Sequence, residues 1–367
     1  MLRQLTRAPR RLLITSDAVG GIWRYTLELT RELVRQGDIV TIAGLGPHPS
    51  ARQAEEAMEL AEVVWLATRP DWLVEAPAEL DGFAAEIEPL LRERDIDVVQ
   101  LNAGCMAAGL DARCPVIVVS HSCIASWFKE VRGCRPDRRW SWHYRRTKAG
   151  LARADIVVTP SASHGEQLCE LYGPLSHLTV VHNGIAAAPP QRSPVDMIFA
   201  AARWWDPGKN AAVLDAAAEL THWPIFAAGD IRAPHGEAFE FHNAISLGSL
   251  PHGEVQALMG RTGIFVSPSL YEPFGLAALE AASSGAALVL ADIPTYRELW
   301  RDSALFFPPR DAAALAAILN SLAADEPARG ALAEAAKRRS HRFTSARQAA
   351  EMRSLYDAVC SQRERRA

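Results

Sequence analysis

Two glutamates, Glu272 and Glu280, open and close the most informative run of the sequence, Glu-Pro-Phe-Gly-Leu-Ala-Ala-Leu-Glu. The run follows an apolar strand pattern at 264–267 and predicts a helix over Pro273–Ser284. Proline is favoured in a first helical turn because its missing N–H would have no partner there, and Gly285 stands where a left-handed stop is expected. One carboxylate therefore stands just before a helix and the other about two turns into it.

The amino end of that helix is a predicted anion site. Free backbone N–H groups are expected around Phe274, Gly275 and Leu276, where the helix dipole is positive and glycine allows close approach to the backbone. The two carboxylates would repel a phosphate, so we expect them to accept hydrogen bonds from sugar hydroxyls. This combination indicates a sugar nucleotide. The alternative is a helix-terminal acid at Glu272 and a solvated surface residue at Glu280.

Two cations bracket a tight turn after the strand pattern at 197–201. Arg203 and Lys209 flank the sequence Asp-Pro-Gly at 206–208. Such a turn can aim both cations at one diphosphate, which neutralises a leaving group without a metal. Two exposed surface cations are the alternative.

The N-terminal half offers a glycine pair and a histidine. Gly20 and Gly21 follow a predicted strand and precede an amphipathic helix, where glycine permits close backbone approach, although a structural turn needs the same residues. The G-x-G-x-x-G fingerprint is absent, which disfavours a nicotinamide-dependent dehydrogenase. His121 follows the strand pattern at 116–119, at a carboxyl end where a ligand site would lie. A lone histidine there is more often a structural hydrogen-bonding residue.

A basic aromatic segment, Arg132–Lys148, carries seven formal cations against one acid and interleaves Trp140, Trp142 and Tyr144. It is a candidate surface for anionic lipid headgroups or an anionic acceptor. The alternative is an arginine-rich helix whose aromatic side chains face the core. Further along, His182-Asn183-Gly184 predicts a turn, because asparagine and glycine tolerate left-handed conformations.

Short apolar runs alternate with amphipathic stretches along the chain, which predicts an α/β fold of parallel sheets covered by helices on both faces. The expected strands are 11–16, 39–43, 63–66, 98–101, 116–119, 156–159, 179–181, 197–201, 225–228, 245–247, 264–267 and 287–291. Three prolines in 186–194 disfavour regular structure and predict a linker there. It would separate an N-terminal domain, 1–185, from a C-terminal domain, 195–343, and a closing helix at 344–362 would pack back on the N-terminal domain.

Composition excludes several classes of protein. The 367 residues are 49% apolar and 22% charged, which is ordinary globular usage, and the net charge of −4 disfavours nucleic-acid binding. Six scattered cysteines without a C-x-x-C pair indicate neither a zinc site nor a disulfide framework. No apolar run approaches the ~18 residues of a membrane span. We expect a cytoplasmic protein, with peripheral contact to the inner face of the membrane through Arg132–Lys148 left open.

With these residues assembled, the chain resembles a retaining glycosyltransferase of family 4 with the two-domain GT-B architecture. The run from Glu272 to Glu280 carries most of the resemblance. Individually weaker matches lie at Gly20-Gly21, His121, His182-Asn183-Gly184, Arg203, Lys209 and Gly248-Ser249-Leu250. The resemblance implies two doubly wound Rossmann-like domains that face each other across a cleft.

The resemblance also implies roles for individual residues. Glu272 would bind hydroxyls of the donor sugar and Glu280 those of the ribose. Arg203 and Lys209 would hold the diphosphate, assisted by the helix start near Gly275.

In the same way, Gly248 and Leu250 would contact the base through the backbone, and the Gly20-Gly21 loop would lie over the phosphates. His121 would stand near the transferred sugar. One departure is that Asn210 follows Lys209, where the family more often has Lys-Gly. The altered turn leaves Trp204 or Trp205 as a wall for the donor or the acceptor.

The expected reaction is transfer of a hexose-type sugar from a nucleotide-diphosphate sugar to a hydroxyl of a glycan, a glycolipid, another lipid-linked acceptor or a small molecule. We expect retention of the anomeric configuration, no metal and no cofactor. The alternatives are a GT-B epimerase or phosphorylase, or a non-catalytic nucleotide-sugar-binding component of a polysaccharide assembly complex.

Overall fold

The computed structural model describes residues 9–186, 194–233 and 236–365. In the N-terminal part the strands are β1 (Arg11–Asp17), β2 (Ile39–Leu45), β3 (Glu62–Trp65), β4 (Val98–Leu101), β5 (Val116–Val119), β6 (Ile156–Thr159) and β7 (Leu178–Val180). Its helices are α1 (Gly21–Arg35), α2 (Ala51–Met58), α3 (Phe83–Glu93), α4 (Ile124–Trp127), α5 (Ser141–Arg153) and α6 (Ala162–Tyr172). Short helical turns are η1 (Asp71–Leu73), η2 (Pro77–Leu80), η3 (Gly104–Ala107), η4 (Phe128–Arg132) and η5 (Arg138–Trp140).

The C-terminal part repeats the same alternation. Its strands are β8 (Val195–Ala201), β9 (Ile225–Ala228), β10 (Ile245–Gly248), β11 (Thr262–Ser267), β12 (Ala287–Ala291) and β13 (Leu305–Phe307). Its helices are η6 (Pro207–Lys209), α7 (Ala211–Ala218), α8 (His252–Met259), α9 (Leu276–Ser283), α10 (Pro294–Trp300), α11 (Ala312–Ala324), α12 (Glu326–Ser340) and α13 (Ser345–Glu364). None of the helices in the described ranges is long and apolar enough to cross a bilayer.

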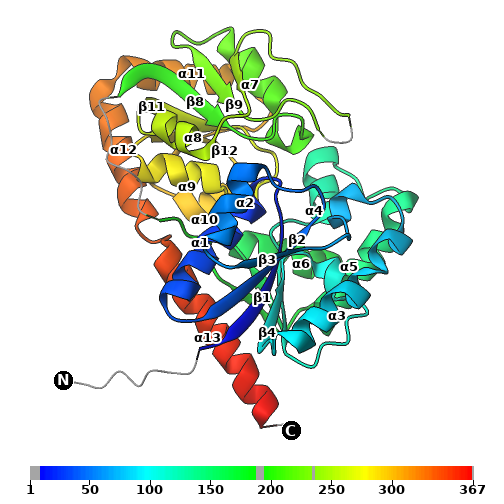
Figure 1. The fold of residues 1–367 in the computed structure, drawn as a ribbon. Helices are drawn as coiled ribbons and strands as arrows, with labels where there is room; N and C mark the ends of the chain where they lie inside the picture. Colours follow the sequence, from blue (N-terminus) through cyan, green and yellow to red (C-terminus); the bar gives the residue numbers. More distant parts are fainter. Residues whose placement is uncertain (1–8, 187–193, 234–235, 366–367) are drawn as a thin grey trace, which may run out of the picture.

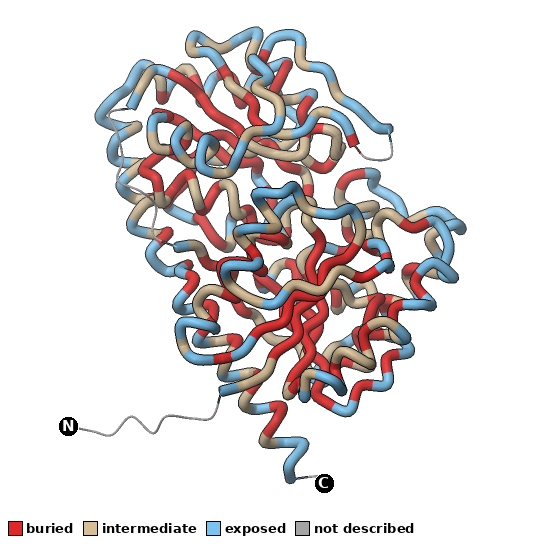
Figure 2. Tube along the Cα trace, in the orientation of Figure 1, coloured by how far each residue is buried: buried red, intermediate tan, exposed pale blue. Residues whose placement is uncertain are grey.

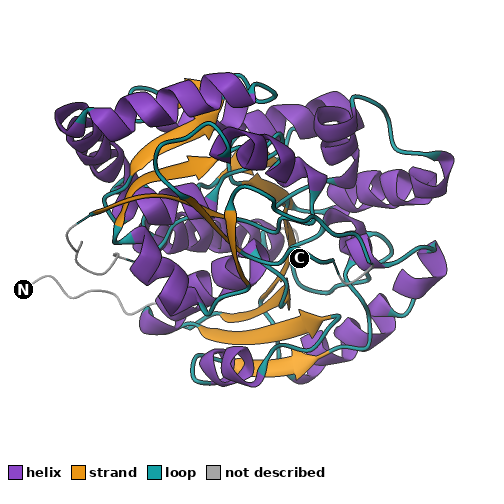
Figure 3. Ribbon diagram, turned by 90° about the horizontal axis from the view of Figure 1, so that it is seen from above, coloured by secondary structure: helices purple, strands orange, loops and turns teal. Residues whose placement is uncertain are grey.

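The strands of the described residues form two parallel sheets with helices on both faces (Figures 1 and 3). Their orders are β3-β2-β1-β4-β5-β6-β7 and β10-β9-β8-β11-β12-β13. In both sheets the order reverses at the first strand of the unit, so each is doubly wound and has its ligand-binding edge at the carboxyl ends of the strands. The predicted α/β fold with two doubly wound sheets is confirmed.

The central strands form because their apolar runs are buried on both sides, as parallel sheets require. Every residue of β5 and of β12 is buried, and Figure 2 shows the sheets as the buried centre of the molecule. Each predicted strand is present, with ends within two residues of the predicted ones. The prediction missed β13, because its three residues are too few to show a periodic pattern.

The last helix, α13, follows the C-terminal part in the sequence but packs along α1 of the N-terminal part (Figure 1). Its Tyr356 is fully buried and donates a hydrogen bond to Gln100 Oε1 in β4 at 2.5 Å. At the crossing point Ser345 N donates to the Ile185 carbonyl oxygen at 3.0 Å. Of the predicted linker, 186–194, only its two end residues lie inside the described residues, so the domain boundaries remain predictions.

The turn expected at His182-Asn183-Gly184 is wrong, because the three residues form neither a turn nor a bend. Neither Asn183 nor Gly184 has a positive φ, so the expected left-handed conformation is wrong. Gly184 instead lets two chain segments touch: a Cβ there would stand 2.2 Å from the carbonyl carbon and oxygen of Thr344. Its N–H also donates to Gln348 Oε1 at 2.7 Å. The glycine therefore allows α13 to cross at this point.

Replacing Gly184 by alanine should destabilise the fold by about 1–3 kcal/mol, because the added methyl group overlaps the Thr344 carbonyl. The control is Gly253→Ala inside α8, where a Cβ meets nothing within 4 Å. Alanine is the better helix former, so the control should gain up to about 1 kcal/mol. Urea unfolding of both variants measures the difference, and equal stabilities would contradict the close approach.

Candidate active site

A cleft of about 2060 Å³ runs between the carboxyl ends of the two sheets. The predicted site residues that line it are Gly20, Gly21, His121, Arg203, Lys209, Leu250, Glu272, Phe274, Gly275 and Leu276. Among the described residues of the lining, Gly248 and Glu280 do not appear. Gly248 is the last residue of β10, and its carbonyl oxygen accepts a hydrogen bond from Gly229 N at 2.7 Å.

Lys209 and Glu272 form an ion pair in the cleft. Lys209 Nζ lies 2.5 Å from Glu272 Oε2, and the side chains are only 15% and 19% exposed. The carboxylate oxygens of Glu272 can accept further hydrogen bonds beside this contact. A lysine beside a hydroxyl-accepting carboxylate suits a ligand that carries both an anion and hydroxyl groups.

The segment Arg203–Lys209, here called the cation turn, is held by two polar side chains. Asp206 Oδ1 accepts from Gly208 N at 2.8 Å and from Trp127 Nε1 of the facing unit at 2.9 Å. After the turn, Asn210 has φ 58°, and its Nδ2 donates to the carbonyl oxygens of Pro268 and Pro309 at 3.0 and 2.7 Å. Asparagine tolerates this left-handed conformation. The departure from Lys-Gly therefore leaves Lys209 in the cleft.

The helix after Glu272 begins later than predicted. The expected range was Pro273–Ser284, but α9 starts at Leu276, with Gly275 before it at φ 91°. The Pro273 carbonyl oxygen accepts from Ser161 Oγ at 2.7 Å, and Phe274 is buried, so tertiary contacts hold these residues outside the helix.

Glycine is needed at position 275 for two reasons. Its φ is positive, and a Cβ there would also meet the Tyr296 ring at 2.7 Å. The free N–H groups of the helix therefore begin at Leu276. The predicted left-handed stop at Gly285 is confirmed, with φ 91°.

The glycine pair Gly20-Gly21 places the amino end of α1 close to the amino end of α9. α1 begins at Gly21. A Cβ on Gly20 would stand 3.5 Å from Arg203 Nη1, and one on Gly21 would stand 3.7 Å from Leu276 Cδ1. The amino ends of α1 and α9 therefore face each other beside Arg203. Helix amino ends and a guanidinium together are suited to a diphosphate.

His121 is part-buried and neutral. Its Nε2 lies 3.2 Å from Asn102 Oδ1, and its ring contacts that of Tyr25 at 4.2 Å between centroids. Asn102 Nδ2 donates to the Thr15 carbonyl oxygen at 2.6 Å, which orients the amide so that Oδ1 faces His121. The histidine proton is therefore on Nε2, and Nδ1 is an acceptor. Burial lowers the pKa of His121 to about 3.

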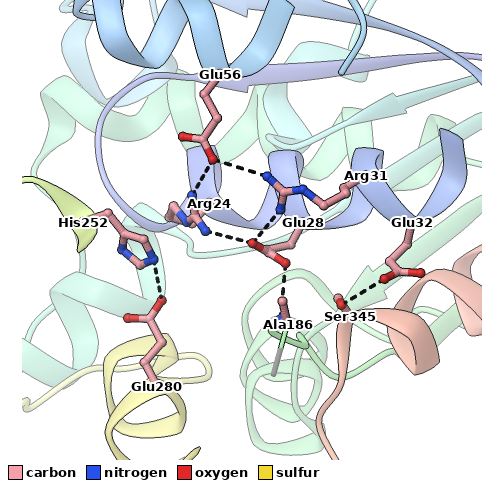
Figure 4. A network of polar contacts seen from close by, with 9 residues as sticks. All are labelled: Arg24, Glu28, Arg31, Glu32, Glu56, Ala186, His252, Glu280 and Ser345. Carbon is pink, nitrogen blue, oxygen red and sulfur yellow. Dashed lines mark hydrogen bonds and ion pairs between the residues drawn. The ribbon is translucent and has the colours of Figure 1, made fainter. Parts of the chain in front are cut away.

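Glu280 lies at the contact between the two units (Figure 4). Its Oε1 is 3.7 Å from His252 Nε2. Burial raises the pKa of Glu280 to about 7, partly offset by Arg24 of α1. Arg24 itself bonds to Glu28 and Glu56 at 2.8 and 2.9 Å. Glu280 is therefore partly protonated and partly ionised near neutral pH, and the charge of Arg24 in the N-terminal part influences this balance.

The two neighbouring tryptophans have different environments. Trp204 is 2% exposed and donates to the Ala228 carbonyl oxygen at 2.8 Å, so its expected role as a cleft wall is wrong. Trp205 lines the cleft, with the Arg203 guanidinium 5.4 Å from its ring centre. Trp72 stands across from it, with ring centroids 6.3 Å apart.

The side chains of the basic aromatic segment, Arg132–Lys148, differ in their exposure. Trp142 and Tyr144 pack against the core, and Tyr144 Oη donates to the Leu171 carbonyl oxygen at 2.7 Å. Arg135, Arg138, Arg145 and Lys148 are exposed. The aromatic side chains are therefore partly structural, whereas most of the cations face solvent.

Sequence reasoning did not group Asp71, Cys105 and His143, whose ligand atoms lie within 4.8 Å of one another and could hold a metal ion. Asp71 Oδ2 is 2.7 Å from His143 Nε2. Burial raises the pKa of Asp71, but the hydrogen bond from His143 brings it below its ordinary value. The three residues come from η1, η3 and α5 at no motif spacing, so the sequence carried no signal for them.

Solved structures share this architecture. Sucrose-phosphate synthase from Thermosynechococcus elongatus has a TM-score of 0.79 at 18% identity, with 96% of this chain and 100% of that chain covered. Anabaena HepE in complex with UDP and glucose has a TM-score of 0.75 at 16% identity, with 95% and 100% covered. The two facing Rossmann-like units are thus the GT-B fold of glycosyltransferases.

Two family models match most of the chain: Glycosyltransferase Family 4 over residues 19–188 and Glycosyl transferases group 1 over residues 238–339. A glycogen synthase of Mycobacterium tuberculosis is 33% identical over 215 residues, 52% of this chain and 50% of the relative. A GDP-mannose:cellobiosyl-diphosphopolyprenol alpha-mannosyltransferase of Xanthomonas campestris is 28% identical over 209 residues, 52% of each. The chain spans about half the length of these curated relatives. It belongs to glycosyltransferase family 4.

The protonation state of His121 can be tested directly. Because its pKa is lowered to about 3, nitrogen-15 NMR should show the neutral Nε2–H form throughout, without titration between about pH 5 and pH 8. His121→Asn assigns the signal, and free histidine in the same buffer provides the reference titration. A midpoint for His121 inside that range would contradict the assigned state.

Proposed function

We propose that the protein is a retaining, metal-independent hexosyltransferase that uses a nucleotide-diphosphate sugar as donor. The acceptor is a hydroxyl of a glycan, a lipid-linked glycan or a small molecule. The observation that carries the proposal is the convergence of Arg203, the Lys209–Glu272 ion pair and the amino ends of α1 and α9 at one point of the cleft.

The charges at that point suit departure of a diphosphate. Arg203 and Lys209 would bind its oxygens, and the helix dipoles of α1 and α9 add partial positive charge where negative charge develops. These groups are in place before reaction, since the cation turn is fixed by Asp206 and Asn210. The diphosphate can therefore leave with its electron pair without a metal.

The remaining groups would hold the sugar and the nucleoside. Glu272, paired with Lys209, accepts from donor-sugar hydroxyls, and His121 offers Nδ1 as a neutral acceptor. Leu250 lines the cleft beyond β10, where its backbone can contact the base, and Gly248 just before it shapes the approach. Glu280 would reach the ribose hydroxyls from the edge of the cleft. The acceptor hydroxyl then attacks on the face the diphosphate leaves, which retains the anomeric configuration.

The names of the similar proteins fit this donor class. The mannosyltransferase relative is named for GDP-mannose, and a solved structural neighbour holds UDP and glucose. The exposed cations Arg135, Arg138 and Arg145 support the further proposal of a cytoplasmic enzyme that contacts anionic lipid at the inner membrane face.

Removing a charged group at the diphosphate and donor-sugar subsites should abolish transfer. Lys209→Ala and Glu272→Ala should each lower kcat by about 100-fold or more, since preorganised charge at the leaving group would be lost. Lys337→Ala and Glu334→Ala on α12 are matched controls away from the cleft. Nucleoside diphosphate release from UDP-glucose, ADP-glucose and GDP-mannose is the measurement. Unchanged rates in Lys209→Ala and Glu272→Ala would contradict the assignment of these residues to the site.

Glu280→Ala should mainly weaken nucleotide binding. The carboxylate accepts hydroxyl hydrogen bonds best when ionised, so nucleotide affinity of the wild type should rise with pH through about 7 and the variant should lose this dependence. Isothermal titration calorimetry with UDP, ADP and GDP measures the nucleotide affinity of the wild type and of the variant across this pH range. A pH dependence that survives in the variant would assign it to another group.

Retention and metal independence are tested on the product. NMR should show the same anomeric configuration in donor and product, and EDTA should leave the rate unchanged. Loss of activity that zinc restores would instead give the Asp71, Cys105 and His143 group a metal role. Turnover with inorganic phosphate as acceptor would favour the phosphorylase alternative.

A further inference from the structure

Asp17 is a carboxylate of the cleft to which neither the motifs nor the proposed function gives a role. It is the last residue of β1, stands three residues before Gly20, and is 6% exposed at the lining of the cleft. Val19 N donates to Asp17 Oδ1 at 2.8 Å. This bond fixes the carboxylate at the carboxyl end of a central strand, where ligands of such sheets bind.

Arg203 and Trp72 both act on the Asp17 carboxylate. The Arg203 side chain also lies against Gly20. Trp72, which lines the same cleft, also lowers the pKa of the carboxylate, and its ring stacks on that of Trp205 with 6.3 Å between the centroids. Asp71, next to Trp72, is a like charge that raises the pKa of Asp17. Asp17 thus lies between the diphosphate subsite and an aromatic wall.

We propose that Asp17 is the catalytic base that receives the proton of the acceptor hydroxyl, and that Trp72 and Trp205 hold the acceptor beside it. This inference rests on the proposed transferase function. Aromatic faces suit the apolar face of a sugar ring, and a carboxylate suits its hydroxyl groups. The acceptor is therefore assigned to the carbohydrate class.

The step balances without a further reactant. The acceptor oxygen forms a bond to the anomeric carbon as its proton passes to the Asp17 carboxylate. The bond from that carbon to the diphosphate breaks, and the electron pair leaves with the diphosphate beside Arg203 and Lys209. Protonated Asp17 then loses its proton to water when the products leave.

Other groups of the site are poorer bases. Burial raises the pKa of Asp17 to about 6, against the lowering effect of Val19 N and Arg203, so at neutral pH it is ionised yet basic enough to take a proton. The pKa of His121 is lowered to about 3, and that of Asp71 is held down by His143. Glu272 is occupied by Lys209.

Donor binding should strengthen this base. The positive charge of Arg203 lowers the pKa of Asp17. A bound diphosphate neutralises that guanidinium and brings negative charge nearby, which favours protonation of the carboxylate. Asp17 would then accept a proton more readily with the donor in place, so deprotonation of the acceptor follows donor binding.

The test is Asp17→Asn, which keeps an oxygen for Val19 N but cannot take a proton at pH 7. With water as acceptor, nucleoside diphosphate release from the best-bound of UDP-glucose, ADP-glucose and GDP-mannose should fall by about 100-fold or more. The wild-type rate should rise with pH through a midpoint at or above about 6, and the variant should lack this rise. With 4-nitrophenol, which is largely ionised at about pH 8, the defect should shrink towards the wild-type rate. Asp196→Asn, exposed on β8, is the matched control.

Two further measurements on the Asp17→Asn variant distinguish a catalytic role of Asp17 from a structural one. Because the folded-state pKa is raised, the ionised Asp17 destabilises the fold above about pH 6, so the asparagine variant should be no less stable than the wild type at about pH 8. Its stabilisation by the donor in thermal melts should be no smaller than that of the wild type, because the neutral side chain does not repel the diphosphate. Release within about threefold of the wild type, with the pH rise retained, would overturn this inference alone and leave the diphosphate as proton acceptor. Absence of donor turnover in the wild type would overturn the proposed function and this inference with it.

Discussion

The geometry of the cleft depends on the carboxylate of Asp206. Its Oδ1 accepts from Gly208 N within the cation turn and from Trp127 Nε1 on the facing domain. A Cβ at Gly208 would lie 2.8 Å from the same indole nitrogen, so the two surfaces touch with no room for a side chain between them. One acceptor atom therefore shapes the turn that carries Arg203 and Lys209 and attaches it to the other domain. The proposed diphosphate subsite consequently depends on both domains.

Around that contact, the acidic residues of the site acquire different properties from their surroundings. Glu272 is paired with Lys209, Glu280 is buried and has its pKa raised to about 7, and Asp17 is buried beside Arg203 with a pKa of about 6. Pairing favours the ionised form, whereas burial opposes it. The same functional group can thus serve as a fixed acceptor, as a group balanced between charge states, and as a proton acceptor.

The sequence was most informative where local pattern decides structure. The apolar runs of β5 and β12 and the stop at Gly285 follow from rules that act within a few residues. It failed where distant contacts decide. Ser161, 112 positions away, keeps Pro273 outside the helix that its own preference predicts. The grouping of Asp17 with Trp72 and Arg203 joins three separate regions of the chain, so no spacing rule could have found it.

The adjacent residues Trp204 and Trp205 show the same limit on the scale of one residue. In an irregular turn no period says which side chain faces the core, and only the fold places Trp204 against Ala228 and Trp205 in the cleft. That placement has a chemical consequence. Trp205 lies under the Arg203 guanidinium and stacks with Trp72, so in the proposed reaction a diphosphate bound by Arg203 and an acceptor held against these rings would contact the same small group of side chains. Arg203 would then couple donor charge to acceptor position, and so departure of the leaving group to arrival of the nucleophile.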